Sequence, residues 1–118
     1  YYAGKYKEGR EQFESHQKVN SQDVENAAWH FLCVARQKGL ATARQKLIKI
    51  DGDSRIPMPE VFQLFAGKAD DENVIAAFKK EDSRTGAYYG YLYLGLYHEA
   101  KGDKAKSIAQ ALTIFRLR

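Results

Sequence analysis

Two short segments with the same residue pattern most constrain the fold of this chain. Residues 29–33 and 91–95 both contain, in order, an aromatic residue, two intervening residues, a leucine and a small residue. A glycine follows each segment, Gly39 and Gly102, and a second run with helical spacing begins after each glycine. A small side chain at a helix crossing lets the neighbouring helix approach closely. The repetition therefore predicts antiparallel helix pairs joined by glycine turns.

A second pairing recurs at the 34-residue interval that is common in helical repeats. Gly9 precedes Phe13 by about one helical turn, and Ala43 precedes Leu47 in the same way. The two aromatic-led segments lie farther apart than one such repeat, and residues 56–80 have the composition of further helices. We therefore expect an inserted helix pair between two repeat units.

Apolar spacing and turn residues together predict the helices. The two prolines, Pro57 and Pro59, lie in one short segment, where a proline favours a helix start. Ser21 and Ser83 are the expected N-caps of the helices that follow them. No segment alternates apolar and polar residues with period two, so no strand is expected. The expected helices cover residues 6–18, 22–38, 41–50, 58–66, 71–80, 85–101 and 104–116.

The length of 118 residues suits one domain with one hydrophobic core. We expect a single unit over residues 1–118. Its parts are repeat segments 1–20 and 22–50, inserted helices 56–80 and a repeat over 84–118.

The net charge of +4 is spread along the chain, where Lys5 and Lys7 alternate with Glu8 and Glu11. A nucleic-acid-binding protein more often concentrates its positive charge in a stripe. We therefore expect no specific nucleic-acid partner, although weak binding to an anionic surface remains an alternative. No apolar run approaches the length of a transmembrane helix.

Few side chains indicate chemistry. Cys33 is the single cysteine, and we expect it to fill the small-residue position as a buried apolar group. His16, His30 and His98 lie on three different expected helices without the spacing of metal ligands. We expect no catalytic residue, no metal and no other cofactor.

Residues 51–53, Asp-Gly-Asp, begin like a calcium-binding loop. The loop needs a further oxygen ligand at the next alternate position, and Arg55 occupies that position. We therefore expect a turn at residues 51–53.

The most complete of these patterns resembles the tetratricopeptide repeat. Tyr91, Leu94 and Gly95, followed by Gly102-Asp103, match the signature of that family, with His98 where a tyrosine is usual. Trp29, Leu32 and Cys33 form a degenerate copy. The resemblance implies an all-α, right-handed helical-repeat solenoid of about six or seven antiparallel helices that binds proteins or peptides in a groove.

Residues 62–67, Phe-Gln-Leu-Phe-Ala-Gly, and the acidic helix start after them are similar to one subfamily, the bacterial outer-membrane lipoproteins named new lipoprotein I. That resemblance implies a lipid-anchored, extracytoplasmic scaffold that recruits cell-wall hydrolases and a protease. A generic tetratricopeptide protein would instead be expected in the cytoplasm.

The repeat family lines its groove with the first helix of each pair. Transfer of those positions to this chain predicts a protein-binding groove with polar and apolar side chains from two helices: His30, Val34, Gln37, Tyr89, Leu92, Leu96 and Glu99. The alternative is that these residues pack against a further repeat or against the inserted helices.

We therefore expect a non-enzymatic scaffold or adaptor. One alternative is the recognition domain of a larger enzyme, and another is a protein that binds an anionic surface. A terminal repeat exposes an apolar face. A homodimer through the last helix, around Leu112, Phe115 and Leu117, is a further expectation.

Overall fold

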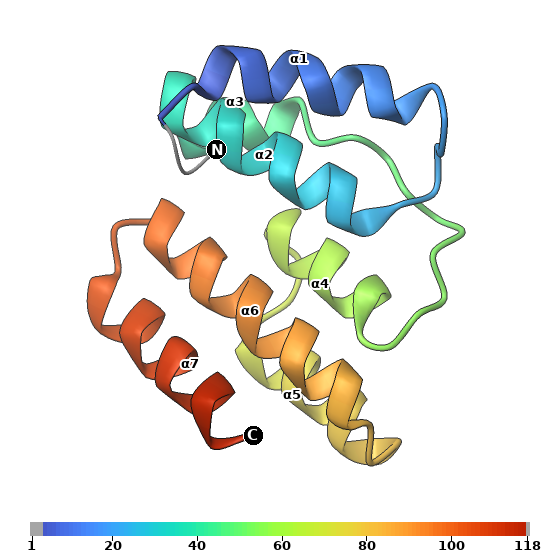
Figure 1. Ribbon diagram of the computed structural model, residues 1–118, viewed down its shortest axis with the longest axis vertical. Helices are drawn as coiled ribbons and strands as arrows, with labels where there is room; N and C mark the ends of the chain where they lie inside the picture. The colour runs from blue at the N-terminus through green and yellow to red at the C-terminus, as the bar shows by residue number, and fades with distance from the viewer. Residues whose placement is uncertain (1–3, 118) are drawn as a thin grey trace.

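The computed structural model describes residues 4–117, and all regular secondary structure in that range is helical (Figure 1). The all-α class is therefore confirmed. The helices are α1 (Tyr6–Gln17), α2 (Val24–Lys38), α3 (Leu40–Gln45), α4 (Met58–Phe65), α5 (Asp71–Lys80), α6 (Arg84–Ala100) and α7 (Lys104–Arg116).

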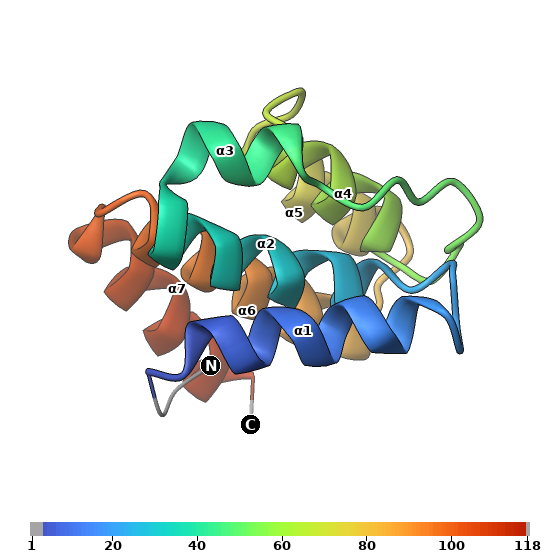
Figure 2. The same ribbon diagram turned by 90° about the horizontal axis from the view of Figure 1, so that it is seen from above.

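Three helices, α2, α4 and α6, contact one another and form the interior of the molecule. Helices α1 and α3 lie on opposite sides of α2 (Figure 2), and α5 and α7 both pack on α6. The Cα radius of gyration is 13.6 Å, close to the value of about 13–14 Å expected for a compact domain of this length. Helices α4 and α5 thus join the helices before and after them into one compact body.

Aromatic rings from the three interior helices form the centre of the core. The Phe65 ring of α4 lies 5.1 Å from the Phe31 ring of α2 and 5.1 Å from the Tyr97 ring of α6. Tyr93 of α6 is fully buried and lies 6.4 Å from the same Phe65 ring. Such aromatic pairs contribute about 0.5–1.5 kcal/mol each beyond the burial of their area. The expected insertion therefore supplies the central residue of the core.

The residues of the repeat pattern occupy the packed positions. Leu32, Cys33 and Leu94 are fully buried. Trp29 and Tyr91 are partly buried against the core, and their rings face Tyr93 and Phe78 respectively.

Gly95 marks the crossing of α6 and α7. A Cβ atom at Gly95 would lie 3.6 Å from Gln110 Cβ and 3.6 Å from the Ser107 backbone oxygen. The turn between these helices has Gly102 at φ +85°, a conformation that favours glycine. Asp103 then caps α7 by accepting a hydrogen bond from the Lys106 N–H. The predicted helix–glycine turn–helix unit is confirmed here.

The third helix is shorter than expected, because α3 ends at Gln45 and the prediction of helix to residue 50 is wrong. The side chain of Gln22 accepts hydrogen bonds from the backbone N–H groups of Asp51 and Gly52. Ile50 is buried. These contacts hold residues 46–57 as an irregular segment across the start of α2.

The two predicted N-caps have different outcomes. Ser83 caps α6 by accepting a hydrogen bond from the Gly86 N–H, as predicted. Ser21 does not cap α2, because the helix begins two residues later with Asp23 as its N-cap. Asp23 accepts from the Glu25 N–H.

Candidate functional site

Helix α7 carries the most extensive exposed apolar surface among the described residues. None of its side chains is classed as buried. Ile108, Leu112 and Phe115 are 59%, 52% and 66% exposed, and their spacing places them on one face of the helix. The other large apolar side chains that are similarly exposed, Val19, Ile56 and Tyr88, lie on three separate parts of the chain.

A shallow groove of about 150 Å³ lies beside this stripe, between α6 and α7. Adjacent residues on a helix are about 100° apart. The stripe therefore borders the face of α7 that contributes to the groove. The groove lining is mainly apolar and comprises Tyr91, Leu92, Gly95, Leu96 and Glu99 from α6, and Ser107, Ala111 and Ile114 from α7. We call the stripe and this groove together the α7 surface.

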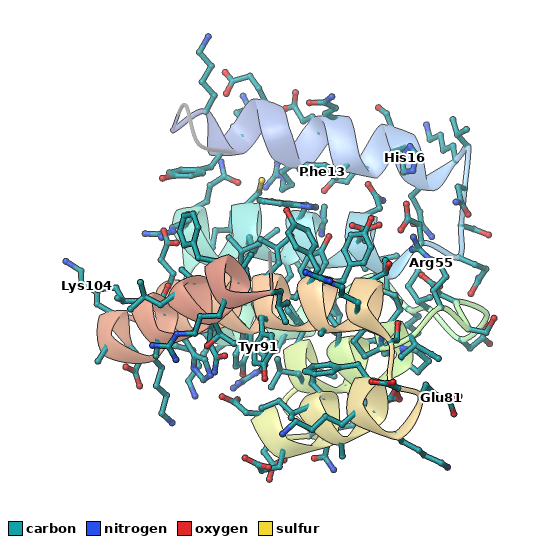
Figure 3. The ribbon with its side chains drawn as sticks, turned by 60° about the horizontal axis from the view of Figure 1, so that its bottom comes forward. Phe13, His16, Arg55, Glu81, Tyr91 and Lys104 are labelled. Carbon is teal, nitrogen blue, oxygen red and sulfur yellow. The ribbon has the colours of Figure 1, made fainter. Side chains whose placement is uncertain are left out.

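One cation flanks the stripe, because Lys104 lies four residues before Ile108 on the same side of α7. Helix α7 contains Lys104, Lys106 and Arg116 and no acidic residue. Lys104 projects from the start of the helix (Figure 3). The groove contains one carboxylate, Glu99, and its Oε1 atom lies 2.6 Å from Arg36 Nη2. The exposed aliphatic and aromatic groups of the α7 surface thus lie on a helix that carries more positive than negative charge.

Two of the residues predicted for the binding groove are inaccessible. His30 is 4% exposed and Val34 is fully buried. Helix α1 packs against α2, and the Glu14 Oε2 atom lies 2.8 Å from His30 Nε2. The prediction that His30 and Val34 line an accessible groove is therefore wrong. Gln37 is exposed near the end of α2 and does not line the groove.

The residues predicted on α6 lie closer together. Leu92, Leu96 and Glu99 all line the groove beside α7, although Leu96 is largely buried in its wall. Tyr89 is partly buried against the core, with its ring 5.7 Å from the Tyr88 ring. Three of the four residues predicted on α6 therefore share one groove. The second wall of that groove comes from α7 and not, as predicted, from α2.

Of the three residues expected at a homodimer interface, Leu112 and Phe115 are exposed. The third, Leu117, packs against the core. The Leu117 carbonyl also accepts a hydrogen bond from the Arg84 guanidinium. Ile108 takes the place of Leu117 in the exposed stripe. It precedes Leu112 by one helical turn, so this apolar spacing could have identified it from the sequence.

A second cluster, which the sequence analysis did not identify, joins the irregular segment to α2. The Arg55 guanidinium donates to Asp53, Asp23 and Glu25. Asp53 also accepts a hydrogen bond from the Val24 N–H at 3.0 Å. Figure 3 shows Arg55 at the end of the molecule where α2 begins. Arg55 thus pairs with Asp53, one of the two carboxylates of the 51–53 segment.

The cluster is closed by a tyrosine from α6, whose hydroxyl donates to Glu25 Oε1 at 2.6 Å. Burial raises the pKa of this Tyr93 hydroxyl, and its hydrogen bond to Glu25 raises it further. The Asp53 carboxyl is also affected by burial, which opposes ionisation. Its hydrogen bonds from Arg55 and Val24 outweigh that effect and lower its pKa. These groups bind one another and form a structural connection.

Two other titratable groups, His98 and Cys33, are buried within the chain. His98 Nε2 lies 2.8 Å from Asp71 Oδ2, which links α6 to α5. Burial raises the pKa of the Cys33 thiol, so the reactive thiolate is disfavoured. Among residues 4–117 no group of three or more His, Cys, Asp and Glu side chains is arranged to hold a metal ion.

No family model matches the chain, and neither a curated protein nor a solved structure is significantly similar to it. The resemblance to tetratricopeptide proteins therefore remains a prediction. Among the described helices, none has both the length and the apolar character needed to span a bilayer.

Proposed function

We propose that this chain is a non-enzymatic scaffold that binds an α-helical segment of another protein on the α7 surface. The observation that carries the proposal is the exposure of Ile108, Leu112 and Phe115 on one face of α7. Removing apolar surface of such side chains from water is favourable by about 25 cal/mol per Å². An amphipathic helix presents apolar residues at the spacing needed to cover this stripe.

The charge on α7 favours an acidic partner. Acidic side chains beside the apolar face of the partner would meet Lys104 at the start of the stripe and Arg116 beside its end, and such complementarity increases specificity and association rate. A symmetric contact with a second copy would instead bring Lys104 and Arg116 of one copy near the same cations of the other. We therefore favour an acidic amphipathic helix over the homodimer.

The proposed place of this scaffold in the cell comes from the family resemblance. Buried small residues at Cys33 and Gly95 and the Gly102-Asp103 turn support a tetratricopeptide-like arrangement. The similarity to the envelope lipoproteins suggests an adaptor of the bacterial cell envelope. In either setting, the α7 surface would hold one partner and raise its effective concentration near another.

Synthetic helical peptides of roughly four turns test the proposal. One peptide carries leucines at i, i+4 and i+7 with glutamates beside them. A second replaces every glutamate with lysine, and a third has the acidic composition in scrambled order. Fluorescence anisotropy should show that the acidic amphipathic peptide binds at least about tenfold more tightly than the other two, equivalent to ~1.4 kcal/mol.

Substitution of the stripe provides the matched test. Ile108→Lys with Leu112→Lys should weaken binding of the acidic amphipathic peptide at least about tenfold. Val19→Lys, at an exposed apolar residue outside the α7 surface, should leave it unchanged. Equal binding by the scrambled peptide would contradict recognition of an amphipathic helix. Tighter binding to vesicles containing anionic lipid would favour the surface-binding alternative, and a concentration-dependent dimer that blocks the peptide would favour a second copy.

A further inference from the structure

A second hollow lies outside the α7 surface, between α3, the irregular segment that follows it, and the end of α4. Its volume is about 550 Å³. Leu47 and Phe62, both partly buried against the core, supply apolar wall, and the buried Ile50 adds to it. Helix α3 lies on the side of α2 away from α1 (Figure 2), so this cleft is remote from the outer face of α1.

Positive charge is concentrated around the cleft. Arg44, Lys49 and Lys68 line it, with Asp51 as the single carboxylate, which gives the lining a net charge of +2. Within the described part of the chain, no Asp or Glu oxygen lies within 4.0 Å of the charged nitrogens of these three cations. The cleft therefore contains positive charge that the surrounding side chains do not neutralise by ion pairing.

The position of Arg44 is set by its neighbours. Its Nη2 atom donates to the Tyr97 hydroxyl. A Cβ atom at residue 67 would lie 3.1 Å from Arg44 Nε, and Gly67 has φ +79°. Gly67 thus combines a left-handed backbone with the space that the guanidinium needs. The remaining guanidinium donors of Arg44 are available to a ligand in the cleft.

The opposite wall is also held in place. Gln22 Oε1 accepts from the Asp51 N–H at 3.0 Å and from the Gly52 N–H at 2.7 Å. A cleft whose walls are already ordered loses less conformational entropy when it binds a ligand. These contacts fix the wall of the cleft formed by residues 51 and 52.

We infer that the cleft binds a small organic acid, whose carboxylate lies among Arg44, Lys49 and Lys68 and whose alkyl or aryl body lies against Leu47 and Phe62. The planar guanidinium group of arginine matches the two oxygens of a carboxylate. The apolar wall favours a ligand with an apolar body over a bare anion. This site is additional to the proposed helix-binding function and uses a different surface.

Isothermal titration calorimetry with defined probes tests the inference. Octanoate combines the two features of the ligand, octan-1-ol has the apolar body without the charge, and acetate has the charge without the body. Octanoate should bind at least about tenfold more tightly than either of them. Inorganic phosphate and octyl phosphate form a further arm that tests the preference for a carboxylate.

A pair of variants tests the location. Lys49→Gln with Lys68→Gln removes two cleft cations and should weaken octanoate binding at least about fivefold. Lys7→Gln with Lys18→Gln removes the same charge from the exposed surface of α1 and its C-cap, and should leave binding unchanged. Both variants should bind the acidic amphipathic peptide alike and unfold at the wild-type temperature.

Three results would overturn the inference. Equal binding of octanol and octanoate would show that charge does not contribute. Equal weakening by the two double variants would place the effect in the net charge of the protein. Tighter binding of either phosphate than of octanoate would reassign the cleft to phosphate.

Discussion

The Arg55 Nη2 atom lies 2.7 Å from Asp53 Oδ2, and this pair holds the irregular segment after α3 against the start of α2. The Asp53 side chain is 3% exposed and that of Arg55 is 52% exposed. The charge of the buried Asp53 carboxylate is therefore balanced by an Arg55 side chain that is about half exposed to solvent. The surrounding carboxylates of Asp23 and Glu25 belong to the same network.

Removal of the Asp53 charge should destabilise the chain. Asp53→Asn weakens the hydrogen bonds to Arg55 and the Val24 N–H. Because these bonds involve a charged acceptor, we expect a loss of about 1–3 kcal/mol in the free energy of unfolding, measured by urea denaturation. Glu99→Gln, in an ion pair whose two side chains are partly exposed, is the control and should cost less than about 1 kcal/mol. A similar loss in the two variants would contradict a special role for Asp53.

The stabilisation from Asp53 should depend on pH. Its pKa in the folded chain is lowered by Arg55 and Val24 despite burial, so folding favours the ionised carboxyl. The contribution is complete above the unfolded pKa of about 4 and is lost as the pH falls through the lowered folded pKa. The difference in unfolding free energy between wild type and Asp53→Asn should be constant from about pH 5 to 7 and shrink below about pH 4. A difference that persists to about pH 2 would contradict this assignment.

Two glycines of α6 should respond in opposite ways to alanine. A Cβ atom at Gly90 would lie 2.8 Å from two ring carbons of Phe78, whose side chain is buried. The overlap should make Gly90→Ala destabilising by about 1–3 kcal/mol. At Gly95 the nearest atoms are 3.6 Å away, an ordinary contact, so the helix preference of alanine should make Gly95→Ala neutral or stabilising by up to about 1 kcal/mol. Thermal unfolding of the two variants checks the order, and the reverse order would contradict the packing of α5 on α6.

The Cys33 thiol should resist modification while the chain is folded. The side chain is fully buried, and burial raises its pKa. Reaction with a disulfide reagent at pH 8 should therefore be at least about a hundredfold slower in buffer than in denaturant. Rapid labelling of the folded chain would show that the α2 face is open at Cys33.

Local signals predicted much of the helical framework. The Gly102-Asp103 turn and the Ser83 cap lie in the segments where the sequence placed them. Such features depend on neighbours within a few residues, which the sequence shows directly. The end of α3 at Gln45 was missed because the bonds that oppose further helix come from Gln22, which is distant in sequence.

The site residues were also harder to predict, because the residues that surround them come from distant parts of the sequence. Spacing identified one face of α2, but it could not show that α1 covers His30 and Val34. The partners of Arg55 include Glu25, 30 residues earlier in the chain. Leu92 and Leu96 were placed correctly on one helix, yet their groove required α7 as its second wall.

The central claim is that another protein's acidic amphipathic helix docks on the exposed face of α7. Titration of the isotope-labelled chain with the acidic amphipathic peptide, followed by backbone amide chemical shifts, locates the contact. We predict that the largest shifts lie in α7 and the adjoining face of α6, around Ile108, Leu112 and Leu92, and that the scrambled peptide causes none of this size. Largest shifts in α1 or α3, or equal shifts with both peptides, would contradict the claim.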